Sequence, residues 1–200
     1  MASNRSLTKA ERIQSRADFR RLRPALIGDL DGDVLEIGPG KGDNLQHYRT
    51  SVRWTGLEPN ASWHRQIEER ARRLGLSIRL LEGAAERIEL PDASLDAVVG
   101  TLVLCSVTDQ ARSLAEIRRV LKPGGRYVFI EHVAAPAGSW SRRAQKLYTV
   151  FSGRTSGCHA DRETWRAIER AGFSSLDYQR VDLPEILGLT VPWIAGTAVK

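Results

Sequence analysis

The chain has 200 residues, of which 42% are hydrophobic, and a formal net charge of +6. This length and composition predict one α/β domain, and the lack of a long apolar run argues against an integral membrane span. The positive charge is spread along the chain without a basic run interleaved with aromatic residues, so we expect no nucleic-acid partner. The polar N-terminus and the presence of only two cysteines predict a cytoplasmic protein without a signal peptide or a disulfide framework.

Residues 1–30 are predicted to form a helical lid that precedes the main domain. Between residues 8 and 30 an apolar stripe lies among many arginines, as in an amphipathic helix that Pro24 could break. The same pattern suits a helix on a membrane surface, which leaves peripheral membrane contact open. We favour packing against the domain, because the polar face is of mixed charge and no long apolar run accompanies the stripe.

From residue 31 onward, apolar strands alternate with helices. Strands are predicted at 34–37, 52–57, 77–81, 95–104, 126–133, 173–180 and 194–199. Helices are predicted from residue 44, directly after a glycine-rich turn, and at 60–74, 109–121 and 161–171. This alternation predicts a parallel sheet with helical crossovers. Residues 134–160 break the alternation, and we expect this insertion to cover the acceptor within a domain that spans residues 31–200.

A glycine-rich turn follows the first predicted strand at Gly38, Gly40 and Gly42. Glycine lets the backbone approach a ligand closely and adopt φ values that side chains resist. A strand, a glycine turn and a helix form the nucleoside-binding corner of doubly wound sheets. Glu58, at the end of the second predicted strand, could accept both ribose hydroxyls there. The same residues would also suit a tight turn and an acidic helix cap without any ligand.

Four segments in a fixed order, VLEIGPGKG, TGLEPN, PDASLDAVV and RVLKPGG, resemble class I S-adenosylmethionine (SAM)-dependent methyltransferases over roughly residues 30–200. The resemblance implies SAM as the cofactor and a doubly wound, seven-stranded Rossmann-like sheet, mostly parallel with an antiparallel C-terminal strand. The cofactor-binding residues that it implies are Glu36, Gly38, Pro39, Gly40, Gly42, Glu58, Pro59, Asn60, Ala84, Ala85, Glu86, Thr101, Leu102 and Val103. Many relatives carry Asp at the position of Ala84, so that here a backbone group or Glu86 would hold the adenine amine.

A narrower resemblance links segments 101–107, 131–135, 157–165 and 198–200 to methyltransferase-like enzymes that include membrane-associated alkyl thiol S-methyltransferases of animals. It implies methylation of a small organic acceptor, apolar or thiol-bearing. O- or N-methylation of a secondary metabolite or a lipid headgroup stays open. A nucleic-acid methyltransferase is less favoured, because segment 100–103 offers no side-chain amide or carboxylate to hold an exocyclic amine. The apolar N-terminal anchor of those relatives is not expected here, and the oligomeric state is left open.

Two histidines are candidates for the catalytic step. Methyl transfer to a thiol needs the thiolate, and a neutral imidazole is a suitable base. His132 ends the fifth predicted strand, where ligands bind in such sheets, and either acts on the acceptor or makes a structural hydrogen bond. His159, in the irregular segment, is the second candidate. Trp140, Tyr148 and Phe151 in that segment either line an apolar acceptor pocket or pack in the core.

No metal site is expected. Cys105, Cys158, His132 and His159 carry metal-binding groups, but their spacing matches no common zinc pattern. Cys105 is predicted to be a buried small residue. Glu131 alternates to the side of the strand opposite His132, where it orients the surroundings of that histidine or pairs with an arginine.

Overall fold

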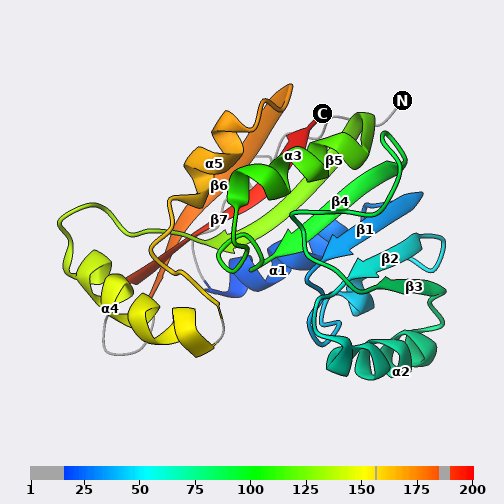
Figure 1. Ribbon diagram of the computed structural model, residues 1–200, viewed down its shortest axis with the longest axis horizontal. Coiled ribbons are helices and arrows are strands. Elements are labelled where there is room, and N and C mark those ends of the chain that lie inside the picture. The colour runs from blue at the N-terminus through cyan, green and yellow to red at the C-terminus, as the bar shows by residue number, and fades with distance from the viewer. Residues whose placement is uncertain (1–15, 156, 185–189) are drawn as a thin grey trace.

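The computed structural model describes residues 16–155, 157–184 and 190–200. Within these ranges, seven strands form one sheet in the order β3-β2-β1-β4-β5-β7-β6 (Figure 1). They are β1 Asp33–Ile37, β2 Arg53–Leu57, β3 Ile78–Leu81, β4 Leu95–Thr101, β5 Leu121–His132, β6 Ser175–Pro184 and β7 Thr190–Val199. Neighbouring strands from β3 to β5 pair in parallel, whereas β7 runs antiparallel to both β5 and β6. The predicted doubly wound, seven-stranded sheet with an antiparallel C-terminal strand is therefore confirmed.

Helices cover both faces of this sheet. They are α1 Arg16–Ile27, α2 His64–Leu74, α3 Gln110–Val120, α4 Trp140–Thr155 and α5 Thr164–Arg170, with the 3₁₀ turns η2 Leu45–His47 and η3 Ala61–Trp63. Ile117 of α3 lies in one core cluster with Phe129 of β5, and Ile27 of α1 and Ile67 of α2 lie in another with Val128. Because successive side chains of a strand point to opposite faces, these two clusters form the layers above and below the sheet. In the part of the chain that the structure describes, none of the helices is long and apolar enough to cross a membrane.

The helix α1 uses its apolar stripe for packing. Leu22, Leu26 and Ile27 are buried in the same cluster as Val34 at the start of the sheet. Pro24 lies inside the helix, which continues past it, so it does not break the helix as the sequence suggested. The lid role of residues 1–30 stays a prediction, and its first half, residues 1–15, lies outside the described residues.

The α-helix predicted from residue 44, directly after the glycine turn, is wrong. Only the single turn η2 forms there, and the chain becomes extended at Tyr48. The reason is that Asn44 and Tyr48 direct their polar groups to the buried Glu36, while Leu45 is itself fully buried. These inward contacts fix a compact turn, which a longer helix would have to break.

The fifth strand begins five residues earlier than predicted, at Leu121 rather than Arg126. Leu121 pairs with Leu95, and an irregularity in the pairing between Leu95 and Ala97 accommodates the intervening residues. The segment 122–125, expected to end the preceding helix as a turn, is thus part of β5.

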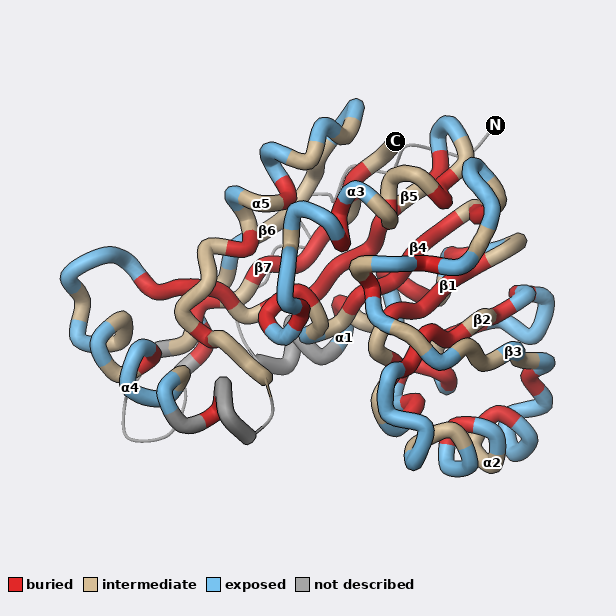
Figure 2. Tube along the Cα trace, viewed as in Figure 1, coloured by how far each residue is buried: buried red, intermediate tan, exposed pale blue. Residues whose placement is uncertain are grey.

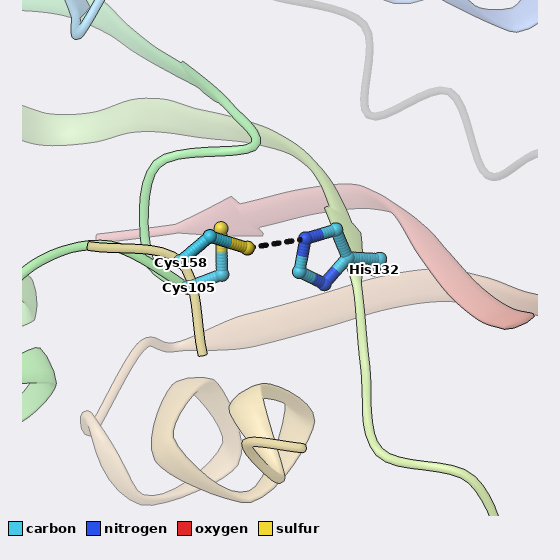
Figure 3. A group of neighbouring side chains, drawn as sticks. All are labelled: Cys105, His132 and Cys158. Atoms are coloured by element: carbon cyan, nitrogen blue, oxygen red, sulfur yellow. Dashed lines mark hydrogen bonds between the residues drawn. The ribbon is translucent and has the colours of Figure 1, made fainter. Parts of the chain in front are cut away.

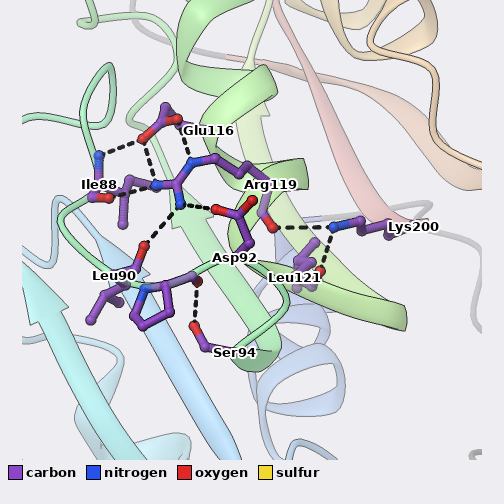
Figure 4. Close-up of polar contacts among 9 residues, drawn as sticks. Ile88, Leu90, Asp92, Ser94, Glu116, Arg119, Leu121 and Lys200 are labelled. Carbon is purple, nitrogen blue, oxygen red and sulfur yellow. Dashed lines mark hydrogen bonds and ion pairs between the residues drawn. The ribbon is translucent and has the colours of Figure 1, made fainter.

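Two of the four sequence segments that carry the family resemblance form a scaffold rather than a ligand site (Figure 4). Arg119 donates hydrogen bonds to the carbonyls of Ile88 and Leu90 and to the side chains of Asp92 and Glu116. These contacts connect the segment before β4 to the end of α3. They lie at the amino ends of the parallel strands, opposite the glycine turn.

The insertion at residues 134–160 carries α4, which projects away from the sheet (Figures 1 and 2). Gln145 ties it down, because its amide donates to the Val133 carbonyl at 2.9 Å and accepts from the Ala135 N–H at 2.7 Å. Trp140 is 72% exposed and Tyr148 is 56% exposed, so neither packs in the core or lines a described pocket. The side chain of Phe151 lies outside the described residues.

Candidate active site

The glycine turn leaves β1 at the carboxyl edge of the sheet. Gly38 and Gly40 have φ values of 56° and 57°, in the region that favours glycine. A Cβ atom on Gly38 would lie 2.8 Å from the side chain of Val103, and one on Gly40 would lie 2.8 Å from Trp63. Glycine at these two positions therefore lets Val103 and Trp63 pack directly against the turn.

Glu58 joins this turn to the end of β2. Its Oε2 accepts the Gly40 N–H at 2.9 Å, and its Oε1 accepts the Asn60 N–H at 2.9 Å. The residue is only 5% exposed, yet it lines the pocket above the glycine turn. A carboxylate has about four lone-pair sites, so each oxygen can accept a further hydrogen bond from a bound hydroxyl.

A pocket of about 380 Å³ opens above these residues. It is lined by Gly38, Gly40, Leu57, Glu58, Pro59, Trp63, Gly83, Ala84, Ala85, Glu86, Leu102, Val103, Ser106, Val107 and Thr108. Its volume is in the range of ligand sites, about 300–1,000 Å³. The glycine cradle, the Glu58 carboxylate and the apolar wall fit the sugar and base of a nucleoside cofactor such as SAM.

A larger cleft of about 720 Å³ lies elsewhere, between segments 29–32 and 122–126 beside Asp96. It faces the amino ends of β1 and β4, where Lys122 and Asp96 pair at 2.8 Å. Ligands of doubly wound sheets bind at the carboxyl ends of the strands, so the smaller pocket is the candidate site.

Most of the predicted cofactor residues line the pocket, but five do not. Glu36, Pro39, Gly42, Asn60 and Thr101 are outside its lining. The residues that sequence reasoning missed are Leu57, Trp63, Gly83, Ser106, Val107 and Thr108. Leu57 and Gly83 adjoin predicted residues along the chain, and the segment 106–108 follows the predicted Val103 by a few residues. Nothing in the sequence indicated that Trp63 reaches back over the turn.

Glu36 supports the turn from within the protein. It is 2% exposed and accepts hydrogen bonds from Asn44 (2.8 Å), Tyr48 (2.9 Å) and Trp54 (3.2 Å). Burial raises the pKa of its carboxyl group, and the three hydrogen bonds oppose this rise. The Asn44 amide also donates to Thr101 at 3.0 Å, so these residues connect β1 to the end of β4 beneath the pocket.

Ala84 lines the pocket, as predicted, and it offers no acidic side chain there. Glu86, two residues on, also lines the pocket, and its Oε1 accepts the N–H groups of Thr108 and Asp109 at 2.6 and 3.3 Å. Glu86 therefore fixes the far wall of the pocket.

A cluster of sulfur and imidazole groups adjoins this pocket (Figure 3). The Sγ atoms of Cys105 and Cys158 and a ring nitrogen of His132 all lie within 4.8 Å of one another, and Cys158 Sγ is 3.2 Å from His132 Nε2. The Sγ of Cys105 is 3.5 Å from the hydroxyl oxygen of Ser106, a residue of the pocket wall. The cluster thus lies beside the cofactor pocket, at the carboxyl ends of β4 and β5.

Glu131 and His159 position the cluster. Glu131 is fully buried, and its Oε1 accepts the N–H groups of Val103 and Leu104 at 2.9 and 3.0 Å. Among the described residues, this carboxylate thus bonds to the backbone of the loop after β4, and not to an arginine. The main-chain N–H of His159 donates to the Cys105 carbonyl at 2.9 Å, which holds the segment with Cys158 against the same loop.

The groups of this cluster have shifted acidities. The hydrogen bond with Cys158 and burial raise the pKa of the Cys105 thiol to about 12, while the same contact lowers the pKa of Cys158. Burial alone would lower the pKa of His132, but its contacts with Cys105 and the nearby Glu131 raise it overall. Burial raises the pKa of Glu131 to about 8.

A nucleoside-sized pocket above a glycine turn, at the carboxyl edge of this sheet, defines a Rossmann-like enzyme that binds a nucleoside cofactor. Comparison with known proteins gives the family. Residues 35–129 match the family model described as a methyltransferase domain. Human thiol S-methyltransferase TMT1A is 40% identical over 171 residues, which cover 84% of this chain and 70% of that protein. The chain belongs to the class I SAM-dependent methyltransferases, and SAM is its methyl donor.

Two further matches show how far the likeness extends. Phosphatidylethanolamine N-methyltransferase of Cereibacter sphaeroides is 30% identical over 153 residues, 76% of this chain and 72% of that protein. The crystal structure of the [4+2]-cyclase SpnF has a TM-score of 0.73 at 21% identity, covering 98% of this chain and 85% of that chain. That likeness shows the fold alone, because one fold supports several reactions.

Proposed function

We propose that this enzyme methylates the sulfur of a small, apolar thiol. The observation that carries the proposal is that this chain is 40% identical to a human thiol S-methyltransferase, over 84% of the chain. The cluster of Cys105, His132 and Cys158 beside the cofactor pocket supports it, because sulfur and imidazole groups suit the binding of a thiol. The two free cysteines also suit a reducing compartment such as the cytoplasm.

When bound, SAM supplies a methyl group that its sulfonium already activates. We assign its sugar to Glu58 and the glycine turn at Gly38 and Gly40, because these residues line the pocket and leave acceptors free. Ala84, Ala85 and Leu102 supply an apolar wall on which a base can lie. The chain's remaining tasks are to hold the acceptor in line and to exclude water.

The acceptor thiol must lose its proton, because the thiolate is the nucleophile. We assign His132 to the acceptor side, since it ends β5 beside the pocket. Its ring packs edge-on against the ring of Trp193, with the two ring centroids 5.8 Å apart. His159 is the second candidate, in the segment bonded to the Cys105 carbonyl. The insertion with α4 follows His132 at this edge of the sheet, and we assign it the role of covering the acceptor.

A second candidate reaction is N-methylation of a lipid headgroup. It is favoured by the 30% identity to a phosphatidylethanolamine N-methyltransferase. It is also favoured by α4, which exposes the large apolar side chains of Trp140, Leu147 and Val150 on a helix that also carries Arg142 and Arg143. Such a surface would suit contact with lipids.

Matched acceptors separate these reactions. Thiophenol, phenol and aniline share a ring and differ in the reacting atom, and labelled SAM reports transfer to each. The proposal predicts labelled methyl thioether and little product from the other two. Faster transfer to phenol, to aniline or to phosphatidylethanolamine in vesicles would contradict it. The variant His132→Ala tests the assignment of this histidine to the acceptor. Its control is His47→Ala, which changes a histidine outside the pocket.

A further inference from the structure

Three soft donor groups from distant parts of the chain meet at one point (Figure 3). Cys105 lies in the loop after β4, His132 ends β5, and Cys158 precedes α5. Their ligand atoms all lie within 4.8 Å of one another. Thiolate and imidazole are the ligands that zinc prefers in proteins.

The spacing suits a single ion. Tetrahedral zinc binds sulfur at about 2.3 Å and nitrogen at about 2.0–2.1 Å, which places ligand atoms roughly 3.3–3.8 Å apart. Cys158 Sγ and His132 Nε2 are already 3.2 Å apart. Small rotations of the side chains would therefore bring the three atoms around an ion, without movement of the sheet.

The backbone that carries the two cysteines is held in place. The N–H of His159 donates to the Cys105 carbonyl at 2.9 Å, and the hydroxyl of Ser152 donates to the Cys158 carbonyl at 2.7 Å. These bonds connect the loop after β4, the segment before α5 and α4. The donor set is thus assembled by the fold before any ion binds.

A buried carboxyl group next to His132 points to a cation. Glu131 is fully buried, and its Oε1 accepts two backbone N–H groups. Its Oε2 is buried and makes no hydrogen bond among the described residues. A buried polar oxygen without a partner is costly, and a positive ion nearby offsets that cost.

We propose that Cys105, His132 and Cys158 bind one zinc ion, and that its fourth position takes the acceptor thiol. The proposal rests on the proposed function in one respect, namely that the acceptor is a thiol. Catalytic zinc sites combine three protein ligands with one position for substrate. The position of the cluster agrees, since Cys105 Sγ is 3.5 Å from the hydroxyl of Ser106 in the pocket wall.

The reaction balances without any change of oxidation state. The acceptor thiol binds the ion and releases its proton to solvent, because a thiol coordinated to zinc is deprotonated. An electron pair of the acceptor sulfur then forms the bond to the methyl carbon. The bond between that carbon and the sulfonium breaks, and its electron pair stays on the departing sulfur. The product is a neutral thioether, a poorer ligand than a thiolate, which favours its release.

Metal binding itself is the first test. The reduced full chain, stripped with a chelator, is titrated with Co²⁺, and bound thiolates are detected by their charge-transfer absorption. The proposal predicts one ion per chain, displaced by Zn²⁺, and protection of both cysteines from alkylation by Zn²⁺. Cys158→Ser and His132→Ala should weaken binding by at least about tenfold, whereas His47→Ala should not. SAM affinity, measured in each variant by calorimetry, reports that the fold is intact.

Two results would overturn the metal site. One is the absence of stoichiometric Co²⁺ and Zn²⁺ binding by the reduced wild-type chain. The other is unchanged affinity in Cys158→Ser. If that variant fails to bind SAM and is unfolded, the alkylation of wild-type cysteines decides: equal rates with and without Zn²⁺ would also overturn the site.

Activity separates this proposal from the proposed function. The stripped chain should methylate thiols at least about tenfold more slowly and recover with Zn²⁺. A stripped chain that methylates thiols at the full rate would overturn the zinc proposal and leave the proposed function intact. A chain that binds the ion but methylates only phenols or amines would overturn the proposed function, and with it the thiol at the fourth position.

Discussion

Replacement of Glu58 by alanine should weaken SAM binding by about 10- to 150-fold. The carboxylate holds the N–H groups of Gly40 and Asn60 at 2.9 Å and faces the pocket, where we assign it to the ribose hydroxyls. Losing hydrogen bonds to a charged group costs about 1.5–3 kcal/mol, and each 1.4 kcal/mol is about a tenfold change in affinity. Isothermal titration calorimetry with SAM and with its demethylated product measures this change.

The control and the refutation of this prediction use the same assay. Glu82→Ala removes an exposed carboxylate that does not line the pocket, and it should leave the affinity unchanged. An analogue without the two ribose hydroxyls should bind the wild type and Glu58→Ala with more similar affinity than SAM does. If Glu58→Ala melts normally and binds SAM as tightly as the wild type, the ribose assignment is wrong.

Three further predictions concern catalysis, the core and pH. His132→Ala should lower thiol methylation by about 10²–10⁴-fold while SAM affinity stays constant, and a fully active variant would make this residue structural. Ile117→Ala, at a fully buried position, should lower the free energy of unfolding, measured in urea, by about 2–5 kcal/mol. The control variant Leu74→Ala, at a position that is 38% exposed, should lower it far less. The hydrogen bond from Arg119 lowers the pKa of Glu116 below its ordinary value of 4.5. Glu116 therefore stabilises the fold above pH 4.5, and this contribution is lost as the pH falls through the lowered pKa. Glu116→Gln should therefore show a smaller loss of stability than the wild type between pH 5 and 3 in urea unfolding, and identical losses would contradict the assignment.

The sheet could be predicted because the sequence repeats a simple local pattern. Apolar runs such as 95–101 alternate with helices, and parallel strands joined by helices have few allowed arrangements. The element after the glycine turn could not be predicted in the same way. Its end depends on Asn44 and Tyr48 reaching the carboxylate of Glu36, and a local pattern does not show which buried acceptor a side chain will meet.

The cofactor pocket and the acceptor cluster differ in how far they could be predicted. Gly38 and Glu58 follow strands directly, so their position at the carboxyl edge follows from the fold. The cluster joins Cys105 and His132, at the ends of neighbouring strands, to Cys158 in the irregular segment. Spacing along the chain argued against a metal site, because common zinc patterns place ligand pairs a few residues apart. Only the path of the insertion brings the third donor to the other two.

Transfer from SAM with a deuterated methyl group to an apolar compound that carries a thiol, a hydroxyl and an amine tests the central claim most directly. The three groups compete within one molecule, so each is present at the same concentration, and NMR of the product locates the label. Our account predicts that the deuterated methyl group is found on sulfur. Label on oxygen or nitrogen, with the thiol still free, would contradict it.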